Sequence, residues 1–391
     1  MNSPIFIRKS KNTKNIPFSL VCSFLLIQLL ACKNQTADTI EQTEQIEQTS
    51  DDTTYPDGIG AARDISSFDL VAEMGVGWSL GNSFDVPSRD KTLWGNPLTS
   101  KAVIDEVKAM GFKTLRIPVT WAPNQANNDP YPIEHNYLTE IKRIVDYGFQ
   151  NKMHVIINVH RDNSWIIPST SEAQKSADRL GSLWTQVAHF FQEYNDSLIF
   201  ETLNEPRIEG ITEEWSGGTS EGRGYVNDFH KAAVDAIRAT GGNNEKRHLM
   251  IPTWAASTVP IAMEELVIPN DDEKIIISLH SYFPWPYAGE ATTSWGSDDD
   301  KSDLIAELDK IKEEWIVERK RPVILGEWGT IEANSLQSRI NYGNFYAKEA
   351  AARGLLTIVW DDGGNFRLFN RRGLSWAFGD VAAAIVAGSQ Q

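Results

Sequence analysis

Short runs of apolar and β-branched residues recur along the chain from about residue 63, and amphipathic stretches lie between them. Runs of this length and composition are typical of strands buried on both faces of a parallel sheet. The pattern predicts eight strands, near 74–80 and at 114–119, 154–159, 198–203, 249–252, 275–279, 322–325 and 356–360.

The intervening stretches space their apolar residues like a helix with one buried face. Residues 99–110 open with the capping residues Thr99 and Ser100 and stop at Gly111. Four further helices have apolar faces within 138–145, 180–191, 226–237 and 304–315. This alternation predicts an α/β fold, a (β/α)8 TIM barrel in a single domain over residues 61–391. The first strand is not followed by a glycine-rich nucleotide loop, which disfavours an open doubly wound sheet.

The first 31 residues have the pattern of a signal peptide, because four basic residues precede a short apolar stretch at 18–31. Ser23 and Gln28 interrupt that stretch, so it fits a signal peptide better than a membrane span. It ends in Leu-Leu-Ala-Cys32, which resembles a bacterial lipoprotein box and implies cleavage before Cys32 and lipidation of its thiol. The alternative is an ordinary signal peptide with an incidental cysteine.

Residues 32–60 are acidic, rich in Thr and Gln, and poor in apolar side chains, which predicts a disordered tether. We therefore expect an exported bacterial lipoprotein at the outer membrane, the cell surface or the periplasmic face, in contact with membrane only through its lipid. The formal net charge of -16 argues against nucleic acid as a partner. Cys22 and Cys32 are the only cysteines, so the domain has neither a disulfide nor a cysteine nucleophile. We expect a monomer.

Two of the predicted strands each end at a glutamate. The run 198–206 ends in Asn204-Glu205-Pro206, and the run 322–328 contains Glu327. A carboxylate at the mouth of an apolar strand is costly unless it has a partner or a role. Two such glutamates predict paired-carboxylate chemistry, as in glycoside hydrolysis.

Catalytic groups of a barrel sit at the C-terminal ends of its strands. There the sequence places polar, aromatic and titratable residues: Asn82, Asp85, Arg116, His160, Asn204, Trp254, His280, Tyr282 and Trp360. Each also has a plainer interpretation, as a satisfied core histidine, a core aromatic or an ion-pair partner. The chain has 13 Trp, which either fill a large core or provide flat platforms for sugar rings.

These strand ends resemble glycoside hydrolase family 5, the large cellulase family of clan A, over residues 65–385. The segments that carry the resemblance are 199–207, 114–121, 279–282 and 326–329. The opening segment 75–82, with Trp94-Gly95-Asn96-Pro97 after it, is similar to the endoglucanase and xyloglucanase subfamily, subfamily 4.

The resemblance implies a retaining endo-β-1,4-glucanase in which Glu205 is the acid/base and Glu327 the nucleophile. It implies that Arg116 and Tyr282 lie against Glu327 and that His160 and His280 line the site. Asn204 would bind the sugar 2-hydroxyl, Trp360 would stack on the glycone sugar, and Asn82 and Asp85 would bind the next sugar outward. Two positions depart from the subfamily pattern, Arg161 in place of a second histidine and Ser79 in place of an asparagine.

The chemistry sets opposite demands on the two glutamates. Glu327 must be anionic, and a nearby Arg116 lowers its pKa. Glu205 must begin protonated, and we expect the charge of Glu327 and partial burial to raise the pKa of Glu205. The seven histidines show no metal-ligand spacing, so we expect neither a metal nor another cofactor.

Several alternatives remain open. Gly77-Trp78-Ser79-Leu80-Gly81 matches the nucleophile elbow of esterases, although a loop follows it. A non-catalytic glycan-binding lipoprotein on an inactive barrel is a second alternative. Among substrates, cellulose-type, mixed-linkage β-glucan and xyloglucan all fit better than mannan or xylan. We expect the loops 161–178, 207–224 and 283–300 to wall the cleft and to supply sugar platforms from Trp165, Trp215, Trp285 and Trp295.

Overall fold

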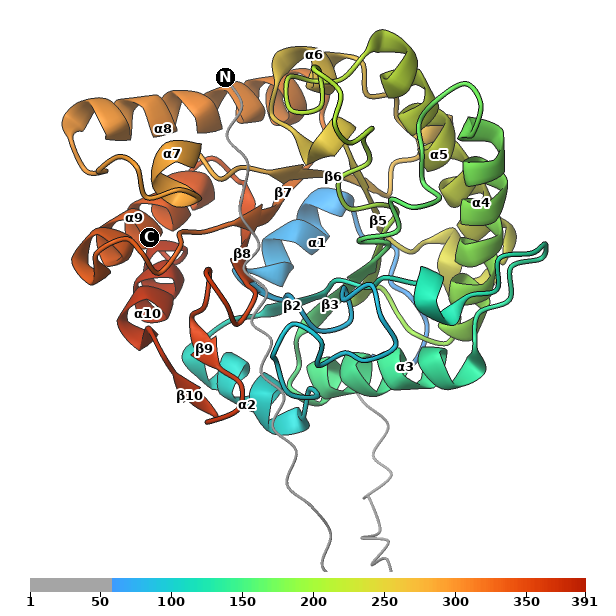
Figure 1. Ribbon diagram of the computed structural model, residues 1–391, viewed down its shortest axis with the longest axis horizontal. Helices are drawn as coiled ribbons and strands as arrows, with labels where there is room; N and C mark the ends of the chain where they lie inside the picture. The colour runs from blue at the N-terminus through green and yellow to red at the C-terminus, as the bar shows by residue number, and fades with distance from the viewer. Residues whose placement is uncertain (1–57) are drawn as a thin grey trace, which may run out of the picture. The chain divides into compact units, whose positions relative to one another are not determined.

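The computed structural model describes residues 58–391, in which eight parallel strands close into a barrel in sequence order (Figure 1). The strands are β1 Gly77–Leu80, β2 Thr114–Ile117, β3 His154–Asn158, β4 Leu198–Glu201, β5 Leu249–Pro252, β6 Ile275–His280, β7 Val323–Trp328 and β8 Leu356–Asp361. The barrel closes where β8 pairs with β1, with Ser79 beside Trp360. The predicted (β/α)8 architecture and all eight predicted strands are confirmed.

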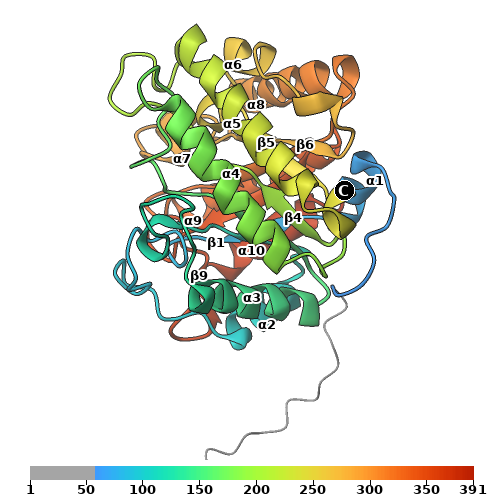
Figure 2. The ribbon, with the colours of Figure 1, turned by 90° about the vertical axis from the view of Figure 1, so that its right-hand side faces the viewer.

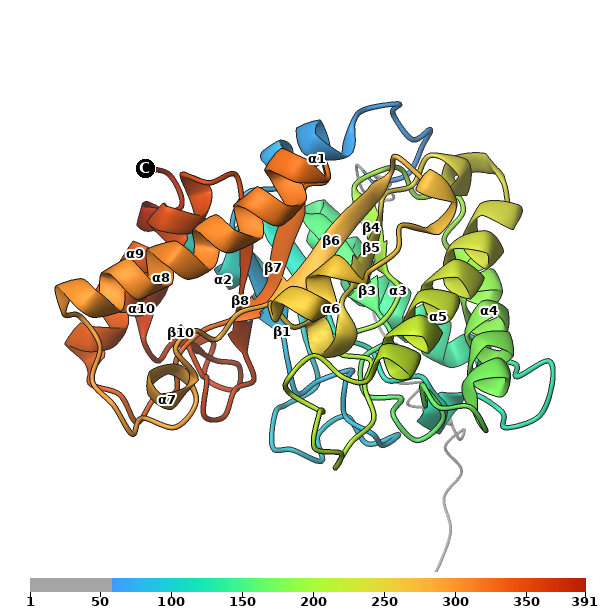
Figure 3. The same ribbon diagram turned by 90° about the horizontal axis from the view of Figure 1, so that it is seen from above.

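The described helices surround the barrel, except for the first, which packs against its interior (Figure 1). They are α1 Ser67–Met74, α2 Lys101–Met110, α3 His135–Gln150, α4 Ala173–Phe190, α5 Ser220–Ala239, α6 Pro260–Glu264, α7 Trp285–Ala288, α8 Asp298–Ile311, α9 Leu336–Ala351 and α10 Gly379–Gly388. Short helical turns are η1 Ala122–Asn124, η2 Gly242–Glu245, η3 Trp254–Ala256, η4 Pro269–Asp271 and η5 Lys312–Glu318, and a small ribbon pairs β9 Phe369–Asn370 with β10 Ser375–Trp376. Figure 2 shows α4 and α5 side by side on one flank, and Figure 3 shows α8 and α9 on another.

The alternation of side chains along each strand divides the core into two layers. Inside the barrel, residues such as Ile156, Ile199 and Ile324 form one buried cluster, which also includes Leu70 and Met74 of α1. Helix α1 therefore packs against the inward side chains of the barrel and is seen within the ring in Figure 1. The larger cluster lies between the strands and the surrounding helices. Burial of these apolar surfaces is the main favourable contribution to folding.

The domain begins slightly earlier than the sequence pattern predicts. Residues 58–60 belong to the predicted tether, yet Ile59 forms a bridge with Tyr194 and Gly58 accepts a hydrogen bond from Asn195. Gly58 also lies so close to Phe149 that an added Cβ would be 2.5 Å from the ring. The predicted signal peptide, Cys32 and the rest of the tether lie outside the described residues. Within 58–391, none of the helices combines the length and apolar character needed to cross a membrane.

Candidate active site

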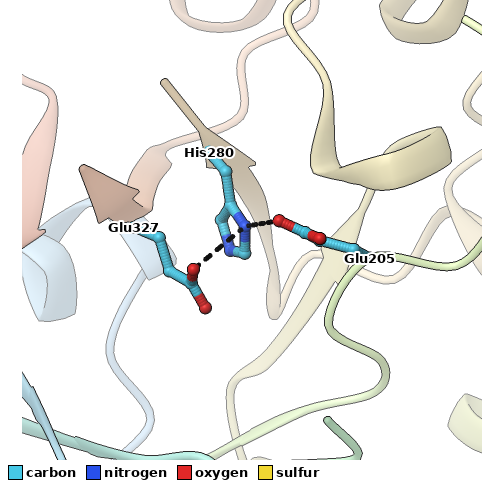
Figure 4. Close-up of side chains that lie close together, drawn as sticks. All are labelled: Glu205, His280 and Glu327. Atoms are coloured by element: carbon cyan, nitrogen blue, oxygen red, sulfur yellow. Dashed lines mark hydrogen bonds and ion pairs between the residues drawn. The ribbon is translucent and has the colours of Figure 1, made fainter. Parts of the chain in front are cut away.

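Glu205, His280 and Glu327 come together at the C-terminal ends of three strands. Glu205 follows β4, His280 ends β6 and Glu327 lies near the end of β7. One carboxylate oxygen of each glutamate and one ring nitrogen of His280 all lie within 4.8 Å of one another. Figure 4 shows the imidazole between the two carboxylates, with an interaction to each. The carboxylate pair predicted from two separate strand ends is thus assembled in one place.

Arg116 holds the Glu327 side of this group. Its guanidinium is fully buried and donates to Glu327 Oε1 at 2.7 Å, to Glu201 Oε2 at 2.8 Å and to Asn204 Oδ1 at 2.7 Å. Burial alone would lower the pKa of Arg116, but the two glutamates outweigh it and leave the pKa above its usual range. The Tyr282 hydroxyl donates to the other oxygen of Glu327 at 3.1 Å. Both predicted neighbours of Glu327 therefore contact it.

Glu205 lies between two basic groups. His280 Nδ1 is 2.8 Å from Oε1, and Arg207 Nη1 donates to Oε2 at 3.2 Å. Burial raises the pKa of Glu205, but the hydrogen bond and charge of His280, with Arg207 behind them, give a net lowering. Burial lowers the pKa of His280, and its two glutamate neighbours reverse this and raise it.

This corrects the expectation that the pKa of Glu205 is raised by Glu327. The physical reason is that His280 stands between the two glutamates, so Glu205 faces a cation more closely than it faces Glu327. His280 Nδ1 and Glu205 Oε1 are 2.8 Å apart, so the protonation of one side chain depends on that of the other.

Sequence reasoning missed Glu201. It is fully buried and accepts from Arg116, from Asn158 Nδ2 at 2.9 Å and from Ser278 Oγ at 2.6 Å. The signal was present, because Ile199 points into the barrel and Glu201 follows two residues later on the same face. An inward glutamate beneath Glu205 requires a cation, and Arg116 on β2 supplies it.

Asp85, which follows β1, and Trp360 of β8 both lie next to His160, which follows β3. The rings of His160 and Trp360 are parallel, with centroids 5.7 Å apart. Trp360 lies against Gly81, where an added Cβ would be 2.6 Å from the indole, so only glycine fits there. Asp85 is fully buried, its Oδ1 accepts from the Ser83 amide, and its Oδ2 has no hydrogen-bond partner.

Asp85→Asn is expected to be more stable than the wild type at neutral pH. Burial raises the pKa of Asp85 from its ordinary 3.8 to about 6, so folding opposes its ionisation. The wild type therefore loses stability between about pH 4 and pH 6, by up to about 3 kcal/mol, and Asn avoids that loss. Urea unfolding at pH 4 and pH 7 measures it: the two proteins should nearly coincide at pH 4 and separate at pH 7. A constant difference across this range contradicts the prediction.

These side chains border a cleft of about 800 Å³. Its lining includes Arg161, Glu205, Trp215, Trp285, Glu327 and Trp360. Each of the three loops predicted to wall the cleft contributes at least one of these residues. The lining also takes Ser257 and Thr258 from the segment after η3, Glu307 from α8 and Phe366, none of which the sequence pattern indicated.

A family model described as Cellulase (glycosyl hydrolase family 5) matches residues 74–365. The chain belongs to glycosyl hydrolase family 5. The match spans all eight barrel strands and every strand-end residue discussed above.

Similar proteins agree with the family 5 assignment. The cellulase/esterase CelE of Acetivibrio thermocellus is 44% identical over 336 residues, which are 84% of this chain but only 41% of that protein. A structure of ZgEngAGH5_4 in complex with a cellotriose has a TM-score of 0.83 and 47% identity, and covers 84% of this chain and 100% of its own. A GH5-4 broad specificity endoglucanase from Clostridium acetobutylicum has a TM-score of 0.81 and 42% identity, and covers 83% of this chain and 100% of its own.

The candidate platform tryptophans of this family 5 chain differ in exposure. Trp215 and Trp285 are 61% and 51% exposed and line the cleft, as predicted for sugar platforms. The sequence places Trp254 among the candidate site residues at the strand ends, where we predict a substrate-binding role. The structure contradicts this prediction, because Trp254 is 1% exposed, does not line the cleft and has Gly218 directly against its ring. Its indole N–H donates to the backbone of Glu214, so it supports the loop that carries Trp215.

Trp165 and Trp295 are likewise buried. Arg179 covers the Trp165 ring at 4.4 Å, and Trp295 packs edge-on against Tyr342 at 5.1 Å. Neither ring lines the cleft, so neither is a platform in this structure.

The two sequence departures have clear positions. Arg161 lines the cleft, stacks over Trp94 at 5.1 Å and places Nε 3.9 Å from Asp85 Oδ2. Ser79 is fully buried within β1 and lies beside Arg116 and Trp360 of the adjoining strands. An esterase elbow requires a serine on a sharp turn from strand to helix, which a residue inside a barrel strand does not provide.

Among residues 58–391, one group of three or more His, Cys, Asp or Glu side chains is spaced closely enough to bind a metal ion. It consists of Glu205, His280 and Glu327. Arg116 and Arg207 already pair with the two carboxylates, so the local charge opposes a further cation.

Asn82 has a positive φ of 52° after Gly81, and its carbonyl accepts from Asn96 Nδ2 at 3.0 Å. That bond holds the loop after β1 at the edge of the site.

Proposed function

We propose that the chain is a retaining endo-β-1,4-glucanase that cleaves internal bonds of β-glucans, with Glu327 as nucleophile and Glu205 as acid/base. The observation that carries the stereochemistry is the approach of the two carboxylates to within 4.8 Å. Retaining enzymes hold the pair about 5 Å apart, whereas inverting enzymes leave about 6.5 to 9.5 Å for a water molecule. The named relatives, one with a bound cellotriose, support a β-1,4-linked glucan as substrate.

Arg116 and Tyr282 prepare Glu327 to attack. They donate to different oxygens of its carboxylate, so they keep it anionic and fix its direction. Attack at the anomeric carbon forms a glycosyl–enzyme ester as the glycosidic bond breaks. Glu205 gives its proton to the departing oxygen, then takes one from the water that hydrolyses the ester.

The proton that Glu205 donates is shared with His280. In the free site the pKa of Glu205 is lowered and that of His280 is raised, so the pair favours a proton on the imidazole. A sugar that excludes water from the site disfavours separated charges and favours the neutral pair. Substrate binding thereby moves the proton across the 2.8 Å hydrogen bond to Glu205 Oε1.

The cleft fits a polymer chain. Trp215 and Trp285 present exposed rings along it, and Trp360 lies at the catalytic pair. Aromatic rings bind the apolar faces of sugars with little demand on substituents, which suits several β-glucans. A cellulose-type glucan is the main proposed substrate, with mixed-linkage glucan and xyloglucan as further candidates.

The test is a product profile of the purified domain on carboxymethylcellulose, mixed-linkage β-glucan, xyloglucan, mannan and xylan. The expected result is a rapid fall in viscosity with release of short oligosaccharides from the β-glucans. Binding to these polymers without any release of reducing ends would instead favour the non-catalytic glycan-binding protein. Cleavage of mannan or xylan alone would overturn the proposed substrate class.

We also propose that the protein is a monomeric, exported lipoprotein anchored through Cys32. The export and the anchor rest on the sequence of residues 1–32 alone. Cys32→Ser is expected to move the protein from the detergent phase to the aqueous phase in phase separation, since one lipid-bearing thiol is lost. Equal partitioning of the two proteins contradicts the anchor.

A further inference from the structure

Arg207 contacts both the acid/base and an aromatic ring of the cleft. Its Nη1 donates to Glu205 Oε2 at 3.2 Å and to the Glu205 carbonyl at 3.0 Å. His280 takes the other carboxylate oxygen, as Figure 4 shows, so the two basic groups hold Glu205 from two sides. Only 14% of the Arg207 side chain is exposed.

The same guanidinium lies over the Trp215 ring at 4.5 Å from its centroid. Its Nε donates to Glu214 Oε1 at 3.0 Å, and Glu214 Oε2 accepts from the Gly210 amide at 2.7 Å. Arg207 is therefore fixed within the loop after β4. One face of Trp215 rests on this arginine, while the ring as a whole is 61% exposed and borders the cleft.

Arg207 contacts both Glu205 and Trp215, so the Trp215 ring borders the cleft on the side of the proposed acid/base. Glu205, which protonates the leaving group, and Trp215 belong to the same segment after β4. Trp360 lies near the end of β8, four strands away around the barrel.

We propose that Arg207 is a positioning residue that couples the Trp215 platform to the acid/base. It supports the ring on which the leaving-group sugar stacks, and its charge sets the protonation of Glu205. This inference rests on the proposed glucanase function and assigns the leaving-group side of the same cleft.

The charges around Glu205 give the direction of the effect. Burial raises the pKa of Glu205, and His280 of β6, then Arg207 and Arg161, lower it. Glu327 of β7, Tyr282 and Glu214 also face the site, and Arg116 of β2 bonds the neighbouring Asn204. Loss of the Arg207 cation leaves the others in place and raises the pKa of Glu205. Because Glu205 must be protonated when the bond breaks, the high-pH limb of activity then moves to higher pH.

The experiment compares Arg207→Met, Arg207→Lys and Trp215→Ala in the full-length enzyme on soluble β-glucan from pH 4 to pH 9. Arg207→Met is expected to raise KM by roughly three- to tenfold and to move the high-pH limb upward by roughly one unit. Arg207→Lys keeps the positive charge, so its high-pH limb should lie close to that of the wild type. Trp215→Ala should raise KM and leave the limb in place, because the charge remains.

Arg319→Met is the matched control. Arg319 also stacks on a tryptophan, Trp315 at 4.1 Å, but donates to the carbonyls of Met263 and Leu266 away from the cleft. It should change neither KM nor the pH limb, and thermal unfolding verifies that each variant is folded.

The outcomes separate this inference from the proposed function. An unmoved limb in folded Arg207→Met overturns the coupling even if KM rises, and an unchanged KM in Trp215→Ala overturns the platform. If the wild type cleaves no β-glucan, the proposed function fails. The affinity for cellotriose, measured by calorimetry, then tests the inference. The inference is overturned as well if neither substitution changes this affinity, or if the wild type does not bind cellotriose.

Discussion

Glu327→Gln is expected to lower kcat/KM on β-glucan by about four to six orders of magnitude. The amide keeps the size of the side chain and can still bond to Arg116 and Tyr282, but it does not attack the anomeric carbon. The fold should survive, because Arg116 retains its pairing with the buried Glu201. Reducing-sugar release measures the activity, and circular dichroism with thermal unfolding checks the structure.

Glu205→Gln should fail in a different way. It removes the proton donor and leaves the nucleophile intact, so substrates with poor leaving groups suffer most. An aryl cellobioside whose leaving group needs no proton should keep much of its glycosylation rate in Glu205→Gln and lose it in Glu327→Gln. Equal losses on both substrates would contradict the assigned roles, and wild-type turnover by either variant would contradict the catalytic pair.

The barrel could be predicted because its signals are local. Each strand is a short apolar run, and helices such as α2 end at a glycine, Gly111, with a positive φ of 114°. Once the strands are counted, parallel pairing brings their C-terminal ends to one rim. Glu205 and Glu327 therefore share a site although they are 122 positions apart in the chain.

The parts that sequence reasoning missed depend on which side chain faces which. Trp254 looked like a rim residue, but Gly218 and Gly222 approach its ring so closely that the loop buries it. Nothing in the sequence near Trp254 reports that contact. The lowered pKa of Glu205 likewise depends on the placement of His280, which reaches it from another strand. Glu201 is different, since the two-residue period of β4 already placed it inside the barrel.

Arg116→Met is expected to abolish activity and to destabilise the fold by about 3 to 5 kcal/mol. The substitution removes the cation that Glu201 and Glu327 share and leaves both carboxylates buried without it. Part of the strain is relieved if one carboxylate takes up a proton, and a protonated Glu327 no longer attacks. Urea unfolding gives the stability, and kcat/KM below the unfolding transition gives the activity.

Two further variants separate the structural role of Arg116 from its catalytic role. Glu201→Gln added to Arg116→Met removes one uncompensated charge, so it should recover part of the stability and little of the activity. Arg247→Met is the matched control, because Arg247 is also fully buried, and burial lowers its pKa to about 9. Arg247 donates to the carbonyls of Leu198 and Tyr194, at the start of β4 and before it. Its loss should lower stability while the folded fraction keeps its turnover. If instead Arg116→Met remained active while only its stability fell, the guanidinium would be a structural ion-pair partner and Glu327 would hold its charge without it.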